Sequence, residues 1–201
     1  MVDIRAFRDE VTDRAARGAP GAPARELATA LGLRTVVLLE GLSDLAAVDT
    51  LAARRGRDLA AEGVCALPMG GATNVGRFAR LLGPDGLGLR LVGLCDEREQ
   101  RFFDRALDDG NVFVCVSDLE EEFIRAMGTE RAEEVVERAG ELRAWQTLVR
   151  QPDQHGRPRD QQLRRFLGTK KGRKIRYGRL LVEGLDPDAV PAPLEDLFAH
   201  L

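Results

Sequence analysis

Acidic side chains recur where apolar segments of the chain end, and carboxylates placed in this way can bind a metal ion. Glu40 directly follows the run VVLL and precedes a glycine, and Asp44 comes one helical turn later. Asp96 closes the run LVGLC, and Glu120 lies just beyond the run VFVCV. A lone acid at the end of a strand is usually a solvated helix cap, but several that converge repel one another unless a cation neutralises them. The pattern therefore predicts a Mg²⁺ or Mn²⁺ site.

Four strand–helix repeats are expected to place these acids at one edge of a sheet. The candidate strands are the apolar runs at 35–41, 63–69, 87–96 and 111–116. Each is followed by a segment with helical spacing of apolar residues, at 43–56, 73–83, 98–107 and 117–128. This alternation is typical of a parallel α/β sheet, in which ligands bind at the carboxyl ends of the strands.

Helical segments flank the predicted core on both sides. They are expected before it at 3–18 and 23–32, and after it at 129–140, 141–151, 161–168 and 174–185. We therefore divide the chain into an N-terminal helical extension (1–33), a core (34–128) and a C-terminal helical segment with a basic patch (129–201). The predicted fold class is α/β, a four-stranded parallel sheet flanked by helices, with helical extensions at both ends.

The charge of the chain is unevenly distributed. The net charge is −3, yet residues 154–179 hold ten Lys or Arg against one acid, and residues 96–141 hold fifteen acids against six Arg. All three lysines of the chain, Lys170, Lys171 and Lys174, lie in the basic segment. Such a segment can bind the phosphates of a nucleic acid. The alternative is a solvated helix face that pairs with the acidic region of the same chain.

The composition argues against several other classes of protein. No run approaches the roughly 20 apolar residues that span a membrane, and the N-terminus has no apolar signal core. Cys65, Cys95 and Cys115 stand singly in apolar runs, which indicates buried thiols of a reduced, cytoplasmic protein. The sequence has neither zinc-ligand spacing nor a P-loop, so we expect no zinc module and no ATPase site of its own.

The ordered motifs resemble a Toprim domain, the Mg²⁺-binding fold of topoisomerases, bacterial primases and the OLD-family (overcoming lysogenization defect) nucleases. The resemblance rests on EGLSD at 40–44, CALPMGGATNVGRFARLL at 65–82, LVGLCD at 91–96, DLE at 118–120 and a late lysine before an apolar helix. It covers about residues 34–185, is closest to the OLD branch and implies a Toprim-like (Rossmann-like) fold. OLD nucleases usually carry an ATPase domain before Toprim, so we expect a free-standing Toprim protein or an ATPase partner in trans.

The resemblance implies a role for each motif residue. Glu40 would be a metal ligand or general acid/base, and Asp44 a second acid of the same site. Asp96 and Glu120 would be further metal ligands, and Lys174 would stabilise charge at the scissile phosphate. The backbone is expected to come close to the ligand at three glycines, Gly41, Gly70 and Gly71.

One position departs from the Toprim pattern. The family's Asp-x-Asp motif would place a second aspartate at position 98, where this chain has Arg98. The acids that can take its place are Glu97 and Glu99, and on a helix start Glu99 lies one turn from Asp96. Without such a replacement the site would hold one metal ion or none.

The function implied by the resemblance is divalent-metal-dependent cleavage of phosphodiesters in DNA, with RNA as the alternative substrate, in DNA repair or phage defence. The cations expected to hold the nucleic acid are Arg164, Arg165, Lys170, Lys171, Arg173, Arg176 and Arg179. Two other functions stay open: a non-catalytic Toprim scaffold that binds nucleic acid or a partner ATPase, and a nucleotidyl transferase or hydrolase that acts on a small phosphorylated nucleotide. We expect no membrane partner, and a homodimer is left open.

Overall fold

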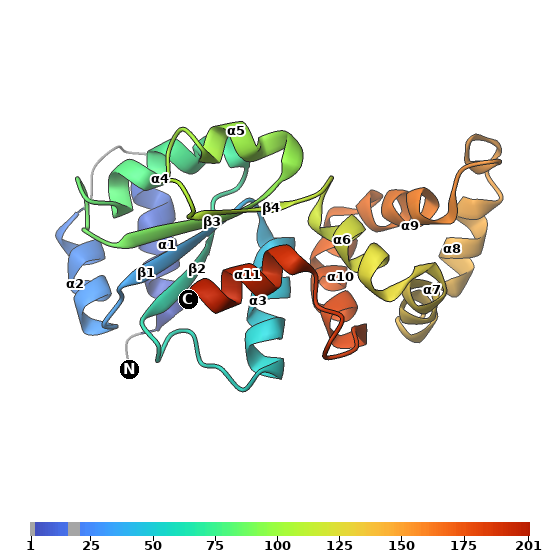
Figure 1. Cartoon of the computed structure of the whole chain (residues 1–201), viewed down its shortest axis with the longest axis horizontal. Helices are drawn as coiled ribbons and strands as arrows, with labels where there is room; N and C mark the ends of the chain where they lie inside the picture. The colour runs from blue at the N-terminus through green and yellow to red at the C-terminus, as the bar shows by residue number, and fades with distance from the viewer. Residues whose placement is uncertain (1–2, 16–20) are drawn as a thin grey trace.

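Four parallel strands form the central sheet of the molecule. The computed structural model describes residues 3–15 and 21–201, and its sheet has the strand order β2–β1–β3–β4 (Figure 1). The strands are β1 (Thr35–Leu39), β2 (Val64–Pro68), β3 (Arg90–Asp96) and β4 (Val112–Cys115). Leu39 at the end of β1 lies in register with Pro68 of β2 and Leu94 of β3. The carboxyl ends of these three strands therefore meet at one edge of the sheet.

Helices cover both faces of the sheet, as the unbroken apolar run of β1 requires. Val36 and Leu38 pack on one face with α1 (Ile4–Ala15), α2 (Ala22–Ala30), α4 (Val75–Leu82) and α5 (Gln100–Phe103). Val37 and Leu39 pack on the other face with α3 (Leu42–Arg54), α10 (Lys171–Gly184) and α11 (Ala192–His200). Because successive side chains of a strand point to opposite faces, β1 contributes residues to both hydrophobic clusters, one on each face of the sheet.

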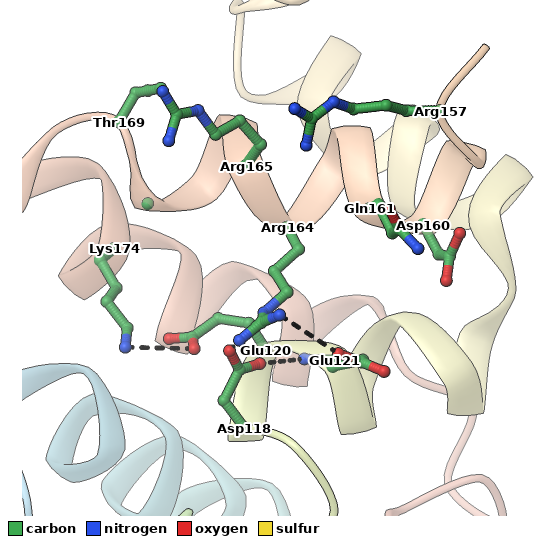
Figure 2. A pocket seen from close by; sticks show the side chains of 11 residues that line it. Asp118, Glu120, Glu121, Arg157, Asp160, Gln161, Arg164, Arg165, Thr169 and Lys174 are labelled. Carbon is green, nitrogen blue, oxygen red and sulfur yellow. Dashed lines mark hydrogen bonds and ion pairs between the residues drawn. The ribbon is translucent and has the colours of Figure 1, made fainter. Parts of the chain in front are cut away.

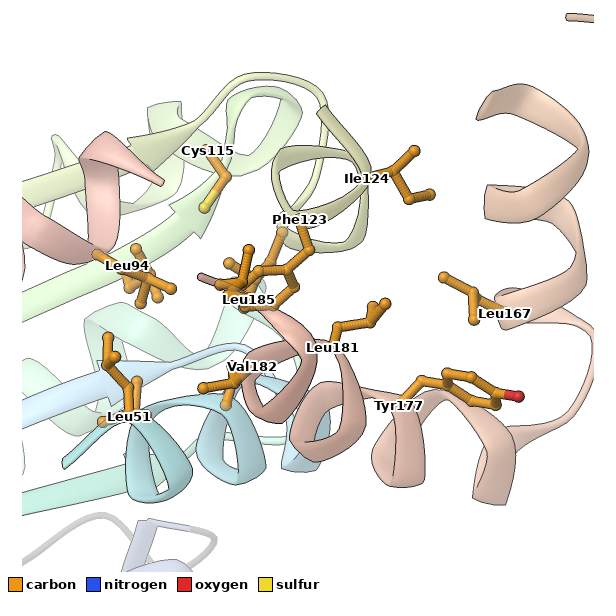
Figure 3. Packing of buried hydrophobic residues seen from close by; sticks show 14 of the residues in the cluster. Leu51, Leu94, Cys115, Phe123, Ile124, Leu167, Tyr177, Leu181, Val182 and Leu185 are labelled. Carbon is orange, nitrogen blue, oxygen red and sulfur yellow. The ribbon is translucent and has the colours of Figure 1, made fainter. Parts of the chain in front are cut away.

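The remaining helices form a lobe beside the carboxyl edge of the sheet, which we call the helical lobe (Figure 1). It consists of α6 (Leu119–Met127), α7 (Thr129–Arg138), α8 (Leu142–Val149), α9 (Arg159–Gly168) and the first part of α10. Its centre is aromatic: the rings of Trp145 and Phe166 lie 5.4 Å apart, and those of Phe166 and Tyr177 lie 6.4 Å apart, both edge to face. The same hydrophobic cluster continues along α10 to the sheet, so lobe and sheet share one core (Figure 3).

The structure confirms the predicted fold class and adds one helix to it. The sequence patterns do not predict helix α11. A helix this short depends on tertiary packing, and Leu194, Leu197 and Phe198 are buried against the rest of the molecule. The helix expected at 98–107 is a short 3₁₀ turn (Glu97–Glu99) followed by the single turn of α5. Of the helix expected at 3–18, residues 16–20 lie outside the described residues. Within the described part, no helix is long and apolar enough to span a membrane.

Candidate active site

Glu40 and Asp96 lie at the topological switch point of the sheet. From β1 the chain passes through α3 to β2, and then returns through α4 to β3 on the other side of β1. The connections diverge between β1 and β3, which is where ligands bind in open α/β sheets. Glu40 directly follows β1, and Asp96 ends β3. The backbone N–H of Asp96 donates a hydrogen bond to Oε1 of Glu40 at 2.9 Å, which joins the two strand ends.

A pocket of about 450 Å³ opens at this edge of the sheet, and we call it the acidic pocket. Its acids are Glu40, Asp44 and Asp96, and helix α10 contributes Lys174 and Ile175 to its lining. The three acids come from β1, α3 and β3, and the lysine comes from a helix far along the chain. Four of the residues singled out by the sequence are thus brought to one cavity.

The three predicted glycines also line the acidic pocket. The N–H of Gly41 donates to Oδ2 of Asp44 at 2.7 Å and so holds that carboxylate at the start of α3. Gly70 and Gly71 have φ values of 72° and 128°, where a side chain would be strained, and a Cβ at either would meet nothing within 4 Å. Bare backbone therefore faces the pocket at these two positions.

Burial and mutual repulsion raise the pKa values of the acids at this edge of the sheet. Burial, together with the negative charges of Glu40 and Asp44, raises the pKa of Asp96 to about 8. Burial and the charge of Glu120 raise the pKa of Asp44 to about 7. The pKa values of Glu40 and Glu120 are raised as well, again chiefly by burial. The carboxylates form one electrostatically coupled group, which a cation would stabilise.

Lys174 is held over this group by the packing of α10 on α3. Its Nζ lies 3.2 Å from Oε2 of Glu120, whose side chain is only 7% exposed. Burial alone would lower the pKa of Lys174, but the negative charges of Glu120 and Asp44 outweigh it and raise the pKa. One turn further along α10, Gly178 lies against the backbone of Ser43, where an added Cβ would come within 2.3 Å of the Ser43 carbonyl oxygen. The missing side chain allows the close approach of the two helices.

A second pocket, of about 680 Å³, adjoins the first at Gly168 and Lys174, and we call it the charged groove (Figure 2). Its ionisable lining residues are Asp118, Glu120, Glu121, Arg157, Asp160, Arg164, Arg165 and Lys174. Figure 2 shows Arg164 reaching from α9 to α6, where its Nε lies 2.5 Å from Oδ2 of Asp118 and its Nη1 lies 3.7 Å from Glu121. The groove thus leads from the surface of the helical lobe to the acidic pocket.

The predicted nucleic-acid-binding cations do not all share this groove. Arg164 and Arg165 line it, and Lys170 is exposed at the start of α10. Arg176 donates to the carbonyl of Ala139 in a separate pocket, and Arg179 pairs with Glu183 at 3.6 Å. The side chain of Lys171 lies outside what the structure describes.

Arg173 is not part of the predicted nucleic-acid-binding surface, because its side chain faces inwards. Its side chain is 6% exposed, lies over the ring of Phe166 at 4.0 Å and pairs with Glu141 at 2.9 Å. Its guanidinium also donates to the carbonyl of Phe166. A run of basic residues in a sequence does not reveal that one of them faces inwards, and Arg173 stabilises the aromatic centre of the lobe instead.

Position 98 holds an exposed arginine, and two acids flank it. Glu97 accepts a hydrogen bond from the N–H of Ser117 at 3.3 Å, so its carboxylate supports the loop that follows β4. The charge of Glu99 contributes to the raised pKa of Glu40, which places Glu99 near the acidic pocket. Of the two candidates to replace the missing aspartate, Glu99 is therefore the better placed electrostatically.

Three further residues matter to the site and were not among the predicted site residues: Asp118, Arg157 and Gly178. Asp118 is the N-cap of α6, accepting from the N–H of Glu121 at 2.8 Å, and it also holds Arg164. A capping pattern in the sequence can locate such an aspartate, but not its ion pair. Arg157 and Gly178 are recognisable only from the way that the lobe packs.

The donor chemistry of the edge fits a hard divalent cation. Carboxylate oxygens are the ligands that Mg²⁺ and Mn²⁺ prefer, and burial with like-charge repulsion favours a bound cation here. Among residues 3–15 and 21–201, no three acidic, His or Cys side chains are grouped closely enough to enclose an ion. Instead, Glu40 and Asp96 accept hydrogen bonds from backbone N–H groups, and Glu120 pairs with Lys174. Side-chain rearrangement would have to accompany metal binding.

Comparison with known proteins shows what this arrangement is similar to. The family model described as "Overcoming lysogenization defect protein-like, TOPRIM domain" matches residues 33–97, which include Glu40, Asp44 and Asp96. No curated protein matches the chain. The resemblance predicted from the sequence motifs is confirmed by the family model and by solved structures.

Two of the similar structures illustrate the match. The C-terminal region of the Burkholderia pseudomallei OLD protein is 21% identical, with a TM-score of 0.59 over 84% of this chain and 96% of that chain. The C-terminal region of the Xanthomonas campestris pv. campestris OLD protein is 25% identical, with a TM-score of 0.60 over 84% of this chain and 94% of that chain. The similarity therefore includes the helical lobe as well as the sheet.

Proposed function

We propose that the protein is a divalent-metal-dependent nuclease that cleaves DNA, on the basis of the match of residues 33–97 to the OLD-like Toprim family model. The observation that carries the proposal is the acidic pocket, in which Glu40, Asp44 and Asp96 face the same cavity as Lys174. The adjoining charged groove supports a polymeric substrate, because Arg157, Arg164 and Arg165 can contact phosphates on one side of the cleaved bond.

Each residue has a distinct part in the proposed reaction. Glu40, Asp96 and Glu120 would hold the metal, with Asp44 and Glu99 as supporting acids. Bound Mg²⁺ or Mn²⁺ would supply Lewis-acid activation of the phosphodiester. Lys174 would add a positive charge next to the phosphate as negative charge develops there. The backbone at Gly70 and Gly71 would let the substrate approach without a steric barrier.

Nicking of supercoiled plasmid DNA with Mn²⁺ or Mg²⁺ tests this proposal. We expect Glu40→Gln and Asp96→Asn each to reduce the rate by about a hundredfold or more, because loss of a metal ligand removes several kcal/mol of transition-state stabilisation. The matched control is Asp85→Asn, which removes one carboxylate from an exposed turn that lines neither the acidic pocket nor the charged groove, and it should leave the rate unchanged. Equal rates in all four proteins would refute the assignment of these acids.

Two observations favour a non-catalytic scaffold as the second candidate function. Arg98 stands where the family has an acid, and the described acids are not grouped around a common point. A scaffold would bind nucleic acid or a partner ATPase without needing a metal. Calorimetric titration with Mn²⁺ separates the two functions: heat of binding that disappears in Asp96→Asn supports the nuclease, and the absence of binding at millimolar Mn²⁺ supports the scaffold.

A further inference from the structure

Two cations of the helical lobe are bound to the acids that adjoin the candidate metal site. Lys174 pairs with Glu120 at 3.2 Å, and Arg164 pairs with Asp118 at 2.5 Å (Figure 2). The carboxylates are the buried partners, with 7% of the Glu120 side chain and 12% of the Asp118 side chain exposed. The Lys174 and Arg164 side chains are 43% and 37% exposed. The cations can therefore turn towards the groove, whereas the acids cannot turn away from the site.

In this state the charged groove has no net charge with which to attract a phosphate chain. Its four cations, Arg157, Arg164, Arg165 and Lys174, are matched by four acids, Asp118, Glu120, Glu121 and Asp160. Binding of a nucleic-acid backbone depends on cations that can neutralise phosphates and release their counterions. Two of the four cations in the groove are already neutralised by the buried acids.

A divalent cation would compete for the same carboxylate oxygens. Glu120 is one of the proposed metal ligands, and the charges of both Glu120 and Asp118 act on Asp96. A divalent ion close to this cluster weakens the attraction of both carboxylates for Lys174 and Arg164, since the charge that held them is compensated. Each released side chain would then contribute a free positive charge to the groove.

We propose that Lys174 and Arg164 serve as internal counter-ions of Glu120 and Asp118, and become phosphate ligands when a divalent cation binds Glu120 and compensates the charge of the neighbouring Asp118. Metal loading thereby converts the charged groove from a neutral surface into one that binds a nucleic-acid strand. This inference rests on the proposed function and specifies the order in which its ligands bind. By thermodynamic linkage, DNA must in turn strengthen the binding of the metal.

Metal-free DNA binding by charge-neutral variants provides the test. The measurement is fluorescence anisotropy of a labelled DNA oligonucleotide, in chelator and in Ca²⁺, which also prefers oxygen ligands. Glu120→Gln frees Lys174, and Asp118→Asn frees Arg164 while keeping a good N-cap on α6. We expect wild-type protein to bind about tenfold more tightly in Ca²⁺ than in chelator, and the double variant to bind in chelator about as tightly as wild type in Ca²⁺.

The matched control is Asp160→Asn, which removes an acid of the same groove that has no ion pair among the described residues. It should raise affinity in chelator by less than either single variant and preserve the response to Ca²⁺. If Asp160→Asn gains as much as Glu120→Gln, the effect is one of overall charge and the proposal is wrong. It is also wrong if the double variant binds no better than wild type in chelator.

The same measurement distinguishes failure of the proposed function from failure of the counter-ion mechanism. If wild-type protein binds no DNA in either chelator or Ca²⁺, the DNA-binding function itself fails, and the counter-ion mechanism fails with it. If wild type binds in Ca²⁺ but the double variant binds no better than wild type in chelator, DNA binding stands and only the counter-ion mechanism is overturned.

Discussion

At the scale of single residues, the buried acids of the sheet edge lower the stability of the folded protein when they ionise. Asp96 and Asp44 are held where burial and neighbouring carboxylates raise their pKa values to about 8 and about 7. In the unfolded chain both would ionise freely near the ordinary value of 3.8. The folded metal-free protein therefore has carboxylates that are harder to ionise than in the unfolded chain, as expected of groups arranged for a bound cation.

The stability of the metal-free protein should therefore depend on pH with a definite sign. Between about pH 4 and about pH 8 the folded state keeps a proton on Asp96 that the unfolded chain has released, so this group lowers the free energy of unfolding as pH rises. Asp96→Asn removes the ionisation. We expect the variant to melt several degrees above wild type at about pH 8 in chelator and at the same temperature at about pH 4.

Thermal melting across this pH range in chelator is the measurement, and Asp85→Asn is the control that removes an exposed carboxylate. Parallel melting profiles for wild type and Asp96→Asn would show that Asp96 ionises as easily in the folded protein as in the unfolded chain. A stabilised Asp96→Asn variant that is also inactive in plasmid nicking would link the stability cost to the site.

At the scale of elements, the crossing of α10 on α3 decides where Lys174 lies. Gly178 lies directly against the carbonyl of Ser43, and Lys174 lies one turn before it on the same helix. Arg54 at the end of α3 donates to the carbonyl of Leu185 at 2.9 Å, and this contact anchors the carboxyl end of α10. With both ends of the crossing held, the lysine is carried over Glu120 by the helix and not by a flexible loop.

Gly178→Ala should therefore harm both stability and the site. The new Cβ would overlap the Ser43 carbonyl, so the helices must separate, and we expect a loss of about 1–3 kcal/mol in the free energy of unfolding. Gly172→Ala on the same helix is the control, because its Cβ meets nothing within 4 Å and alanine favours a helix by about 0.5–1 kcal/mol. Urea denaturation measures both; a neutral Gly178→Ala would mean that the crossing is not close.

At the scale of the whole molecule, the sheet and the helical lobe are joined by one hydrophobic cluster. It extends from Leu51 of α3 and Leu94 of β3 through Val182 to Tyr177 of α10 (Figure 3). The same cluster includes Trp145 of the lobe. Helix α11 closes the other end of the cluster, where Phe198 is buried and the guanidinium of Arg57 donates to its carbonyl. The expected division at residue 129 therefore does not separate two independent cores.

A substitution in α11 should consequently destabilise the distant lobe. Phe198→Ala is expected to cost about 3–5 kcal/mol through the cavity that it leaves. The single tryptophan, Trp145, reports on the lobe, while far-UV circular dichroism reports on the whole chain. We expect both signals to move to the same lower urea midpoint. A Trp145 transition that stays at the wild-type midpoint would instead show that the lobe unfolds by itself.

Local patterns in the sequence suffice for the fold class and for the acids of the site. The run VVLL before Glu40 and the run LVGLC before Asp96 form buried strands, and short continuous apolar runs of this kind are typical of a parallel sheet covered on both faces. Residues at the ends of parallel strands meet at one edge whatever the details of packing. Glu40, Asp44 and Asp96 could therefore be assigned to one site from the sequence alone, and their metal-binding role stays a prediction.

Only the tertiary structure decides which charges face that site. Arg173 and Arg164 belong to the same basic segment, yet one is buried against Phe166 and the other reaches Asp118. Their directions depend on how α9 packs against α6 and α10. Helix packing is a collective outcome of contacts between distant segments, and no spacing within one segment encodes it. The sequence alone determined which residues could do the chemistry, and the long-range packing decided which of them meet.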